Sequence, residues 1–166
     1  MDTNAARRIL VTGGAGFIGA SLVRALEAAG DAVTVVDDGR AAGTASLRGT
    51  AAAIVSGDIG RLAASGEMER LLNGTDAVVH LAARTGVPAS IADPAADWAE
   101  NVVASLALLD LCRRSGVERF VFASSNAAVG AAEGPINEHT VPRPTSPYGA
   151  AKLAMEGYLS AFADSY

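Results

Sequence analysis

The sequence of 166 residues has little cysteine, few aromatic residues and no concentration of positive charge. Its single cysteine, Cys112, cannot form an internal disulfide, which fits a reducing compartment, and its apolar surroundings predict a small buried side chain. No apolar run reaches the ~18–20 residues that a membrane-spanning helix needs. The net charge is −5 and no basic cluster is present, which argues against nucleic acid binding.

Hydrophobic residues make up 50% of the chain, which is enough for one domain with its own core over residues 1–166. Residues 1–8 are polar and lead directly into an apolar segment, so no signal peptide is expected. No internal repeat or linker appears before residue 130. We therefore expect a single-domain cytoplasmic protein.

Short apolar segments alternate with helical patterns along the chain. Apolar runs bounded by turn residues predict five strands, at residues 8–12, 32–37, 53–57, 77–81 and 118–124. Helical spacing of apolar residues predicts helices at 17–29, 97–115 and 147–163. This alternation predicts an α/β fold, a Rossmann-type doubly wound parallel sheet of three layers.

A glycine-rich turn, TGGAGFIG at residues 12–19, separates the first strand from the first helix. It satisfies G-x-G-x-x-G from Gly14, and a variant spacing from Gly13. Glycines permit the tight turn and let backbone N–H groups approach a pyrophosphate, whose charge the helix N-terminus favours. The residues expected to hold a dinucleotide there are Gly13, Gly16, Phe17, Ile18 and Gly19.

Two carboxylates follow at the end of the second strand. Asp37 lies 18 residues beyond Gly19, where a carboxylate accepts hydrogen bonds from the adenosine ribose of a dinucleotide. A carboxylate there repels a 2′-phosphate, so the sequence favours NAD over NADP, and Asp38 reinforces this preference. Arg40 points the other way, because a nearby arginine serves a 2′-phosphate.

Tyr148 and Lys152 are four residues apart, which places them one turn apart on the same face of a helix. Ser146 is the predicted N-cap and Pro147 the first helical residue. Tyr148 would then lie in the first turn, where the helix dipole stabilises a negative charge. A neighbouring ammonium also favours a phenolate, so the pair is a candidate for proton transfer.

These motifs resemble those of the extended short-chain dehydrogenase/reductase family, and within it the NAD-dependent nucleotide-sugar epimerases of the UDP-glucose 4-epimerase type. The segments that carry the resemblance are TGGAGFIG at 12–19, Asp58-Ile59, HLAA at 80–83, the serine pair 124–125 and Tyr148-Gly-Ala-Ala-Lys152. They follow the family's order and approximate spacing, and the resemblance extends over essentially the whole chain.

The resemblance implies an isomerase of carbohydrate metabolism with NAD as cofactor and a nucleotide-sugar, most often a UDP-sugar, as substrate. Tyr148 would take a proton from the sugar 4-hydroxyl while a hydride passes from C4 to NAD and later returns to the other face. Ser125 would hydrogen-bond the reacting oxygen, and Lys152 would also bind the nicotinamide ribose. Besides Tyr148 and Lys152, further cofactor contacts are implied at Asp58, Ile59, Leu81, Ala82, Ala83 and Asn101. Asn101 could instead be a helix-surface amide.

The chain also departs from the family pattern. Asn126 and Ala127 follow Ser125 where dehydratases and decarboxylases carry acidic residues, which favours plain epimerisation. Family members are longer, so we expect the N-terminal portion of a longer architecture, without its C-terminal substrate domain. The alternatives are a related nucleotide-sugar reductase, dehydratase or decarboxylase, and a truncated non-catalytic NAD-binding module.

A homodimer is a further implication of the resemblance, with Leu106, Leu109 and Tyr158 as candidate contacts unless they face the sheet. Residues 84–93 are expected to form a loop that lines the substrate. His80 and His139 are far apart in the sequence and have no accompanying ligand cluster, so both are expected to be structural and no metal is predicted.

Overall fold

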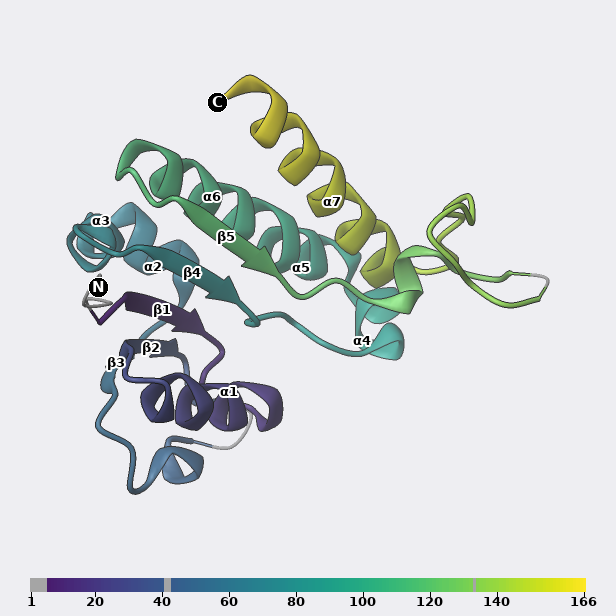
Figure 1. Cartoon of the computed structure of the whole chain (residues 1–166). Coiled ribbons are helices and arrows are strands. Elements are labelled where there is room, and N and C mark those ends of the chain that lie inside the picture. The colour runs from purple at the N-terminus through teal and green to yellow at the C-terminus, as the bar shows by residue number, and fades with distance from the viewer. Residues whose placement is uncertain (1–5, 41–42, 133) are drawn as a thin grey trace. The chain divides into compact units, whose positions relative to one another are not determined.

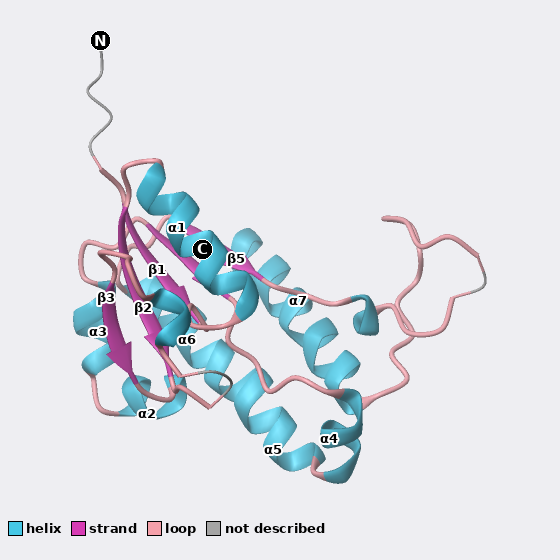
Figure 2. Ribbon diagram, turned by 90° about the horizontal axis from the view of Figure 1, so that it is seen from below, coloured by secondary structure: helices cyan, strands magenta, loops and turns pink. Residues whose placement is uncertain are grey.

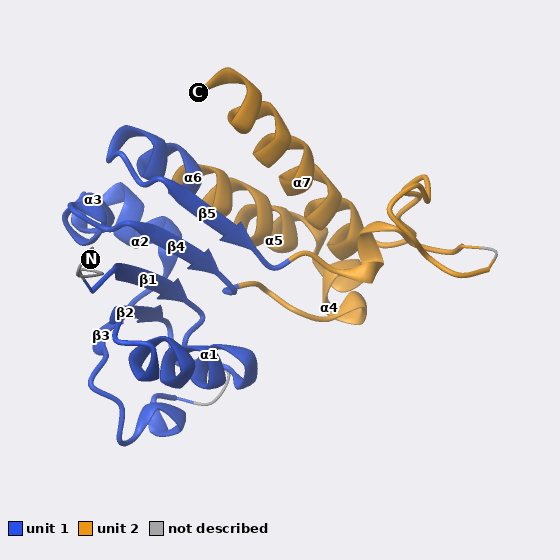
Figure 3. Ribbon diagram, viewed as in Figure 1, with its two compact units in different colours: residues 1–82, 108–123 blue, residues 83–107, 124–166 orange. Residues whose placement is uncertain are grey.

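The computed structural model describes residues 6–40, 43–132 and 134–166; the first five residues of the polar N-terminal segment lie outside it. Its contacts divide the chain into two compact units (Figure 3). Unit 1 comprises residues 1–82 and 108–123, and unit 2 comprises residues 83–107 and 124–166. One domain over residues 1–166 therefore stays a prediction.

Unit 1 is built on a parallel five-stranded sheet with the strand order β3-β2-β1-β4-β5 (Figure 1). Its strands are β1 (Arg8–Thr12), β2 (Ala32–Asp37), β3 (Ala53–Ser56), β4 (Ala77–His80) and β5 (Arg119–Phe122). The strand order reverses between β1 and β4, and open α/β sheets bind ligands at the carboxyl end of such a switch point. All five predicted strands are confirmed to within two residues of their ends.

Helical elements connect the strands and follow the last one. Unit 1 contains α1 (Phe17–Ala28), the 3-10 turn η1 (Ala45–Leu47), α2 (Ile59–Ala64) and α3 (Glu67–Leu72). Unit 2 contains α4 (Val87–Ala92), α5 (Pro94–Trp98), the π-helical turn η2 (Ala99–Val103), the 3-10 turn η3 (Asn126–Ala128) and α7 (Pro147–Ser165). Helix α6 (Ala104–Arg114) runs from unit 2 into unit 1.

The sheet of unit 1 is apolar on both faces. Ile9 of β1 and Val33 of β2 belong to a buried cluster with Val23 of α1. Helices α2 and α3 lie on the opposite face from α1 (Figure 2), and Met68 of α3 is fully buried. Burial on both faces is what a doubly wound parallel sheet requires, and the Rossmann-type three-layer prediction is confirmed.

The segment from residue 84 to residue 115 differs from its prediction. The expected loop at 84–93 contains α4, and the expected continuous helix at 97–115 begins earlier, at Pro94, and passes through η2. Asp93 explains the break: it ends α4 and caps α5, accepting a hydrogen bond from Ala96 N at 3.0 Å. Helices α2, α3 and α4 are each six residues long, which is too short to show a helical period in the sequence.

Unit 2 is helical, and its central element is α7. This helix contacts α4, α5, η2 and η3, and it buries Ala151, Lys152 and Met155. Its start is the one predicted: the Ser146 hydroxyl accepts a hydrogen bond from Gly149 N at 3.1 Å, and Pro147 follows. In the described part of the chain, no helix combines the length and apolar character needed to cross a membrane.

We predict that Gly19→Ala destabilises the fold whereas Gly157→Ala does not. A Cβ at Gly19 would lie 2.3 Å from the carbonyl oxygen of Gly13, and a Cβ at Gly157 in α7 would meet nothing within 4 Å. Overpacking costs about 1–3 kcal/mol. Replacing a helical glycine in open space should instead stabilise by about 0.5–1 kcal/mol. Urea unfolding of both variants measures the difference, and equal midpoints would contradict the close approach at Gly19.

Candidate dinucleotide and catalytic sites

Gly13 joins the ends of three strands in unit 1. Its backbone is in the left-handed region at φ +68°, and its N–H donates to Val36 O at the end of β2 at 2.8 Å. A Cβ at this position would lie 2.7 Å from the backbone nitrogen of Ala82, just beyond β4. Both the conformation and the close approach require glycine, and they place the loop at the switch point of the sheet.

The first turn of α1 is not capped by a side chain. Gly16 is its N-cap, no acidic residue lies in the first turn, and the first intrahelical bond runs from Ala20 N to Gly16 O at 2.9 Å. The amides of residues 17–19 precede that bond, so they have no acceptor within the helix. Phe17 is 93% exposed, which leaves this helix end open to an anionic ligand.

Asp37 is buried at the end of β2 and already binds two backbone amides. Its Oδ2 accepts from Ala15 N at 2.9 Å, and its Oδ1 accepts from Gly39 N at 2.8 Å. A carboxylate has about four acceptor positions, so acceptor capacity remains for ribose hydroxyls. The guanidinium of Arg40, which could serve a 2′-phosphate, is bound to Asp38. This arrangement supports the preference for NAD.

The remaining predicted residues of unit 1 lie at the same carboxyl edge. Asp58 caps α2 by accepting from Arg61 N at 3.0 Å, and Ile59 begins that helix. Leu81 N donates to Thr12 O at 3.1 Å, and Ala82 N donates to Thr12 Oγ1 at 3.3 Å. The exit of β4 is therefore hydrogen-bonded to the end of β1, just before the glycine loop.

His80 belongs to the same group and is fully buried. Its Nδ1 lies 2.6 Å from Thr12 Oγ1, and its ring makes tilted contacts with the rings of Phe120 and Phe122 of β5. It therefore supports the strand ends, as expected of a structural residue. Among the residues that the structure describes, no group of three or more His, Cys, Asp and Glu side chains could hold a metal ion. Cys112 is buried, which raises the pKa of its thiol to about 12.

The residues of unit 1 fit a dinucleotide on three independent grounds. The loop packs so closely on the exit of β4 and on the start of α1 that Cβ atoms at Gly13 and Gly19 would clash with backbone atoms. The helix end behind it offers amides to a pyrophosphate, and Asp37 offers acceptors to a ribose. Gly13, Gly16, Gly19 and Asp37 would hold these parts of the cofactor.

Unit 2 brings together Ser125, Tyr148 and Lys152. Tyr148 is the second residue of α7, and Lys152 follows one turn later with its Nζ 5.8 Å from the centroid of the Tyr148 ring. That separation is within the ~6 Å at which a cation is attracted to an aromatic face. Ser125 caps η3, where its Oγ accepts from Ala127 N at 3.2 Å.

Gly149 explains how η3 reaches the first turn of α7. A Cβ at Gly149 would lie 2.1 Å from the carbonyl oxygen of Ala127, so the two backbones are in direct contact. This contact sets Ser125, at the start of η3, against the turn that carries Tyr148. The prediction from sequence overlooked Gly149, and a glycine inside α7 is not a sufficient signal of close packing, because a Cβ at Gly157 of the same helix would meet nothing within 4 Å.

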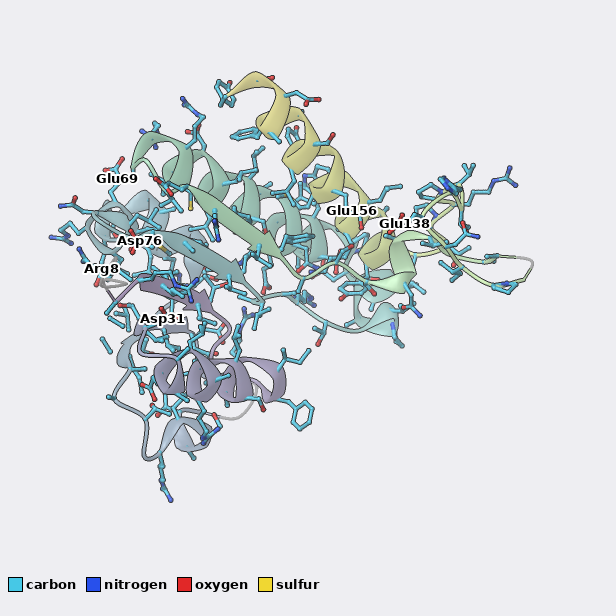
Figure 4. The ribbon with its side chains drawn as sticks, viewed as in Figure 1. Arg8, Asp31, Glu69, Asp76, Glu138 and Glu156 are labelled. Atoms are coloured by element: carbon cyan, nitrogen blue, oxygen red, sulfur yellow. The ribbon has the colours of Figure 1, made fainter. Side chains whose placement is uncertain are left out.

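Ser124 is engaged differently from Ser125. Its hydroxyl donates to the Oε1 of Glu156, which projects from α7 (Figure 4). Ser124 thus ties the segment after β5 to α7, whereas Ser125 bonds locally to η3. This difference supports the assignment of Ser125 as the reacting serine, which stays a prediction.

Asn101 is buried in η2, so it is not a surface amide. Its Oδ1 accepts from Arg84 N, and its Nδ2 donates to Arg84 O and to the Oδ1 of Asp97, each at 2.9 Å. Arg84 also pairs with Glu100 at 3.2 Å. Asn101 therefore fixes the segment that follows Ala83. The prediction from sequence missed Arg84 and Asp97, although Asp97 and Asn101 have helical i, i+4 spacing.

Lys152 is the only lysine among the 166 residues; all twelve other cationic side chains are arginines. It is 3% exposed. Burial lowers the pKa of its ammonium to about 8, and the charge of Asp97 raises that pKa in part. Lysine shifts its pKa readily when buried and arginine does not, so this position uses a property that the other cations lack.

Comparison with known proteins gives one family. The sequence model of the NAD dependent epimerase/dehydratase family matches residues 9–166. A UDP-glucose 4-epimerase of Azospirillum brasilense is 40% identical over 162 residues, which cover 95% of this chain and 45% of that protein. The chain spans about half the length of the curated relatives that it matches.

Solved structures agree with the sequence comparison. A UDP-N-acetylglucosamine 4-epimerase from Methanobrevibacter ruminantium M1, in complex with UDP-N-acetylmuramic acid, has a TM-score of 0.89 at 33% identity and covers 97% of this chain and 52% of its own. A UDP-glucose 4-epimerase of Thermus thermophilus, in complex with NAD, has a TM-score of 0.85 at 39% identity and covers 96% and 51%.

We predict that Lys152 makes the stability of the folded chain depend on pH in the alkaline range. Between about 8 and the ordinary value of 10.5, the unfolded chain binds a proton that the folded chain has lost. The free energy of unfolding contributed by this group therefore rises with pH across that window and falls as the pH drops toward the folded pKa.

Urea unfolding of the wild type and of Lys152→Met across this window measures the contribution. The difference in free energy, wild type minus variant, should increase with pH. A difference that does not change with pH would contradict a buried ammonium at residue 152.

Proposed function

The chain belongs to the NAD dependent epimerase/dehydratase family, and from that premise we propose that the whole protein is an NAD-dependent nucleotide-sugar 4-epimerase acting on a UDP-sugar. The observation that carries the proposal is the pairing of Tyr148 with the buried ammonium of Lys152 in unit 2, the unit that also contains Ser125. Proteins bearing the name UDP-glucose 4-epimerase share 35–40% of their residues with this chain, which supports the substrate class.

NAD is the proposed cofactor, held by the glycine loop and by Asp37 of unit 1. When bound, NAD would serve as both oxidant and reductant of the sugar carbon, so the overall reaction needs no external reductant. The Asp38–Arg40 ion pair supports NAD over NADP, because it engages the cation that a 2′-phosphate would need.

The side chains of unit 2 would handle the proton. Tyr148 would take the proton of the sugar 4-hydroxyl and later return it, and Ser125 would hydrogen-bond that oxygen during the transfer. Lys152 would favour the tyrosine phenolate through its positive charge. The position of Tyr148 in the first turn of α7 adds the helix dipole to the same effect.

Epimerisation is preferred over elimination or decarboxylation on the basis of η3. This turn directly follows Ser125 and consists of Asn126, Ala127 and Ala128, so it provides no carboxylate to assist those reactions. A non-catalytic NAD-binding module remains the alternative of another class, and the arrangement of Ser125, Tyr148 and Lys152 argues against it.

A cytoplasmic homodimer is part of the same proposal. Three elements of unit 2 that contact one another, α5, η2 and α7, each carry an exposed apolar side chain. These side chains are Trp98 on α5, Val103 on η2 and Tyr158 on α7. Of the contacts expected from sequence, Tyr158 is 41% exposed, whereas Leu109 is buried within the chain and cannot contribute. For Leu109 the alternative to an interface contact therefore applies, because its side chain is already packed within the chain.

We predict that Tyr148→Phe, made in the protein at its full length, lowers the kcat for UDP-sugar epimerisation by about 10²–10⁴-fold, the usual contribution of a proton-transfer group. NAD should remain bound, since the phenyl ring keeps its packing and the glycine loop is untouched. Measuring both the turnover and the NAD released on denaturation tests the assignment. Normal turnover in the variant would exclude Tyr148 as the base, and a wild type inactive on every nucleotide-sugar would favour the binding module.

We also predict that Val103→Glu weakens the dimer whereas Val141→Glu does not. Both valines are more than half exposed. Val103 lies on η2, next to the proposed interface elements α5 and α7, whereas Val141 lies in the segment before α7. A charge in an apolar interface is costly, so sedimentation of Val103→Glu should show mostly monomer. A wild type that sediments as a monomer would rule out the dimer.

A further inference from the structure

Asp97 is a buried acid that the proposed proton transfer does not use. It lies in α5, is 1% exposed, and its Oδ1 accepts from Asn101 Nδ2 at 2.9 Å. Its Oδ2 is buried without a hydrogen-bond partner among the described residues. A buried carboxylate in this condition carries a large desolvation cost unless a positive charge lies near it.

We propose that Asp97 is the positioning residue of Lys152: its carboxylate is the counter-ion that keeps the buried ammonium charged and in place beside Tyr148. Asp97 would act through Lys152, without touching the substrate or the cofactor. This inference rests on the proposed function for its catalytic meaning, while the pairing of the two charges is independent of it.

Among the residues that the structure describes, the elements packed against α7 offer no better counter-ion. Helix α4 and turn η3 contain no ionisable side chain. Glu100 of η2 is paired with Arg84, and Glu156 of α7 accepts a hydrogen bond from Ser124. Asp97 remains as the acid on a contacting helix whose charge acts on Lys152.

The electrostatic effects on the two groups agree with a mutual pairing. Burial and the negative charge of Glu100 raise the pKa of Asp97, whereas the hydrogen bond from Asn101 and the charges of Arg84 and Lys152 lower it. Burial lowers the pKa of Lys152, and Asp97 is the group that raises it. Each charge thus offsets part of the desolvation of the other.

Asn101 gives Asp97 its orientation. One amide proton of Asn101 binds Arg84 O and the other binds the Oδ1 of Asp97, so the carboxylate is held at one oxygen. The other oxygen is then available to face a cation. A series of polar interactions thereby connects the segment after Ala83 to the helix that carries Tyr148. It runs from Arg84 through Asn101 and Asp97 to Lys152.

The test is Asp97→Asn, which removes the charge but keeps an oxygen to accept from Asn101. Lys152 is the single lysine of these 166 residues, so its side chain can be followed by NMR in protein with ¹³C-labelled lysine, assigned by its loss in Lys152→Met. An adjacent opposite charge shifts a pKa by about 1–3 units, so the titration midpoint of Lys152 should fall by about one unit or more. Asp110→Asn, which removes a half-exposed carboxylate from α6, should leave the midpoint unchanged.

In the full-length protein, the same substitution should narrow the pH range of epimerisation. In the variant, Lys152 should lose its charge at a lower pH than in the wild type, so the alkaline limb of the kcat/KM profile should shift to a pH about one unit lower. On the alkaline side kcat/KM should therefore fall about tenfold, and on the acid side it should change little. A variant that lost activity equally at all pH values would indicate a merely structural role for Asp97.

The two proposals fail separately. An unchanged NMR midpoint in Asp97→Asn overturns the pairing, whether or not the enzyme is active. A wild type without epimerase activity, but with the midpoint shifted in Asp97→Asn, overturns the proposed function and leaves the pairing intact.

Should Asp97→Asn not fold, Lys152→Met carries the test from the other side. Without the ammonium, the carboxylate of Asp97 should be buried without a counter-ion. The melting temperature of Lys152→Met should therefore fall as the pH rises through the raised pKa of Asp97, and it should fall more steeply than that of the wild type. Equal pH dependence of the two melting temperatures would overturn the pairing.

Discussion

Direct contact between backbones, at positions where no Cβ fits, is the constraint on which both sites depend. Gly13 lies against Ala82 at the end of β4, and Gly19 lies against Gly13 where α1 begins. In unit 2, Gly149 lies against the Ala127 carbonyl. Each contact brings a helix start or a strand end closer than side chains would allow, and each places polar backbone or side-chain groups at a fixed spot.

A second theme is the control of charge in buried surroundings. The chain places several arginines in exposed ion pairs and keeps its one lysine for the interior of unit 2. Burial lowers the pKa of this ammonium to about 8, and the charge of a carboxylate on a neighbouring helix offsets part of that desolvation. Burying two charges costs desolvation free energy, and the pair contributes little to the stability of the fold. A role in chemistry therefore explains its presence better than a role in stability.

Much of the fold followed from local pattern. Each strand is an apolar run buried on both faces, and each long helix has a clear start, so β1 to β5, α1 and α7 were predictable. The region from residue 84 to residue 103 was not, because its helices are short, Pro88 and Pro94 each lie in the first turn of a new helix, and a π-helical turn follows. Propensity and periodicity need about three turns to give a signal, and here tertiary contacts with α7 decide the conformation.

The sequence by itself determined the sheet, the glycine loop with Asp37, and the Tyr148–Lys152 pair, because each depends on spacing within one segment. The tertiary structure alone decided which groups surround that pair. Asp97, Asn101 and Arg84 come from segments that no local period connects to Lys152, and Gly149 matters only because η3 lies against it. Burial, which changes the charge behaviour of Lys152, arises from the packing of α4, α5, η2 and η3 around α7, and packing is a property of the folded chain rather than of any one stretch of it.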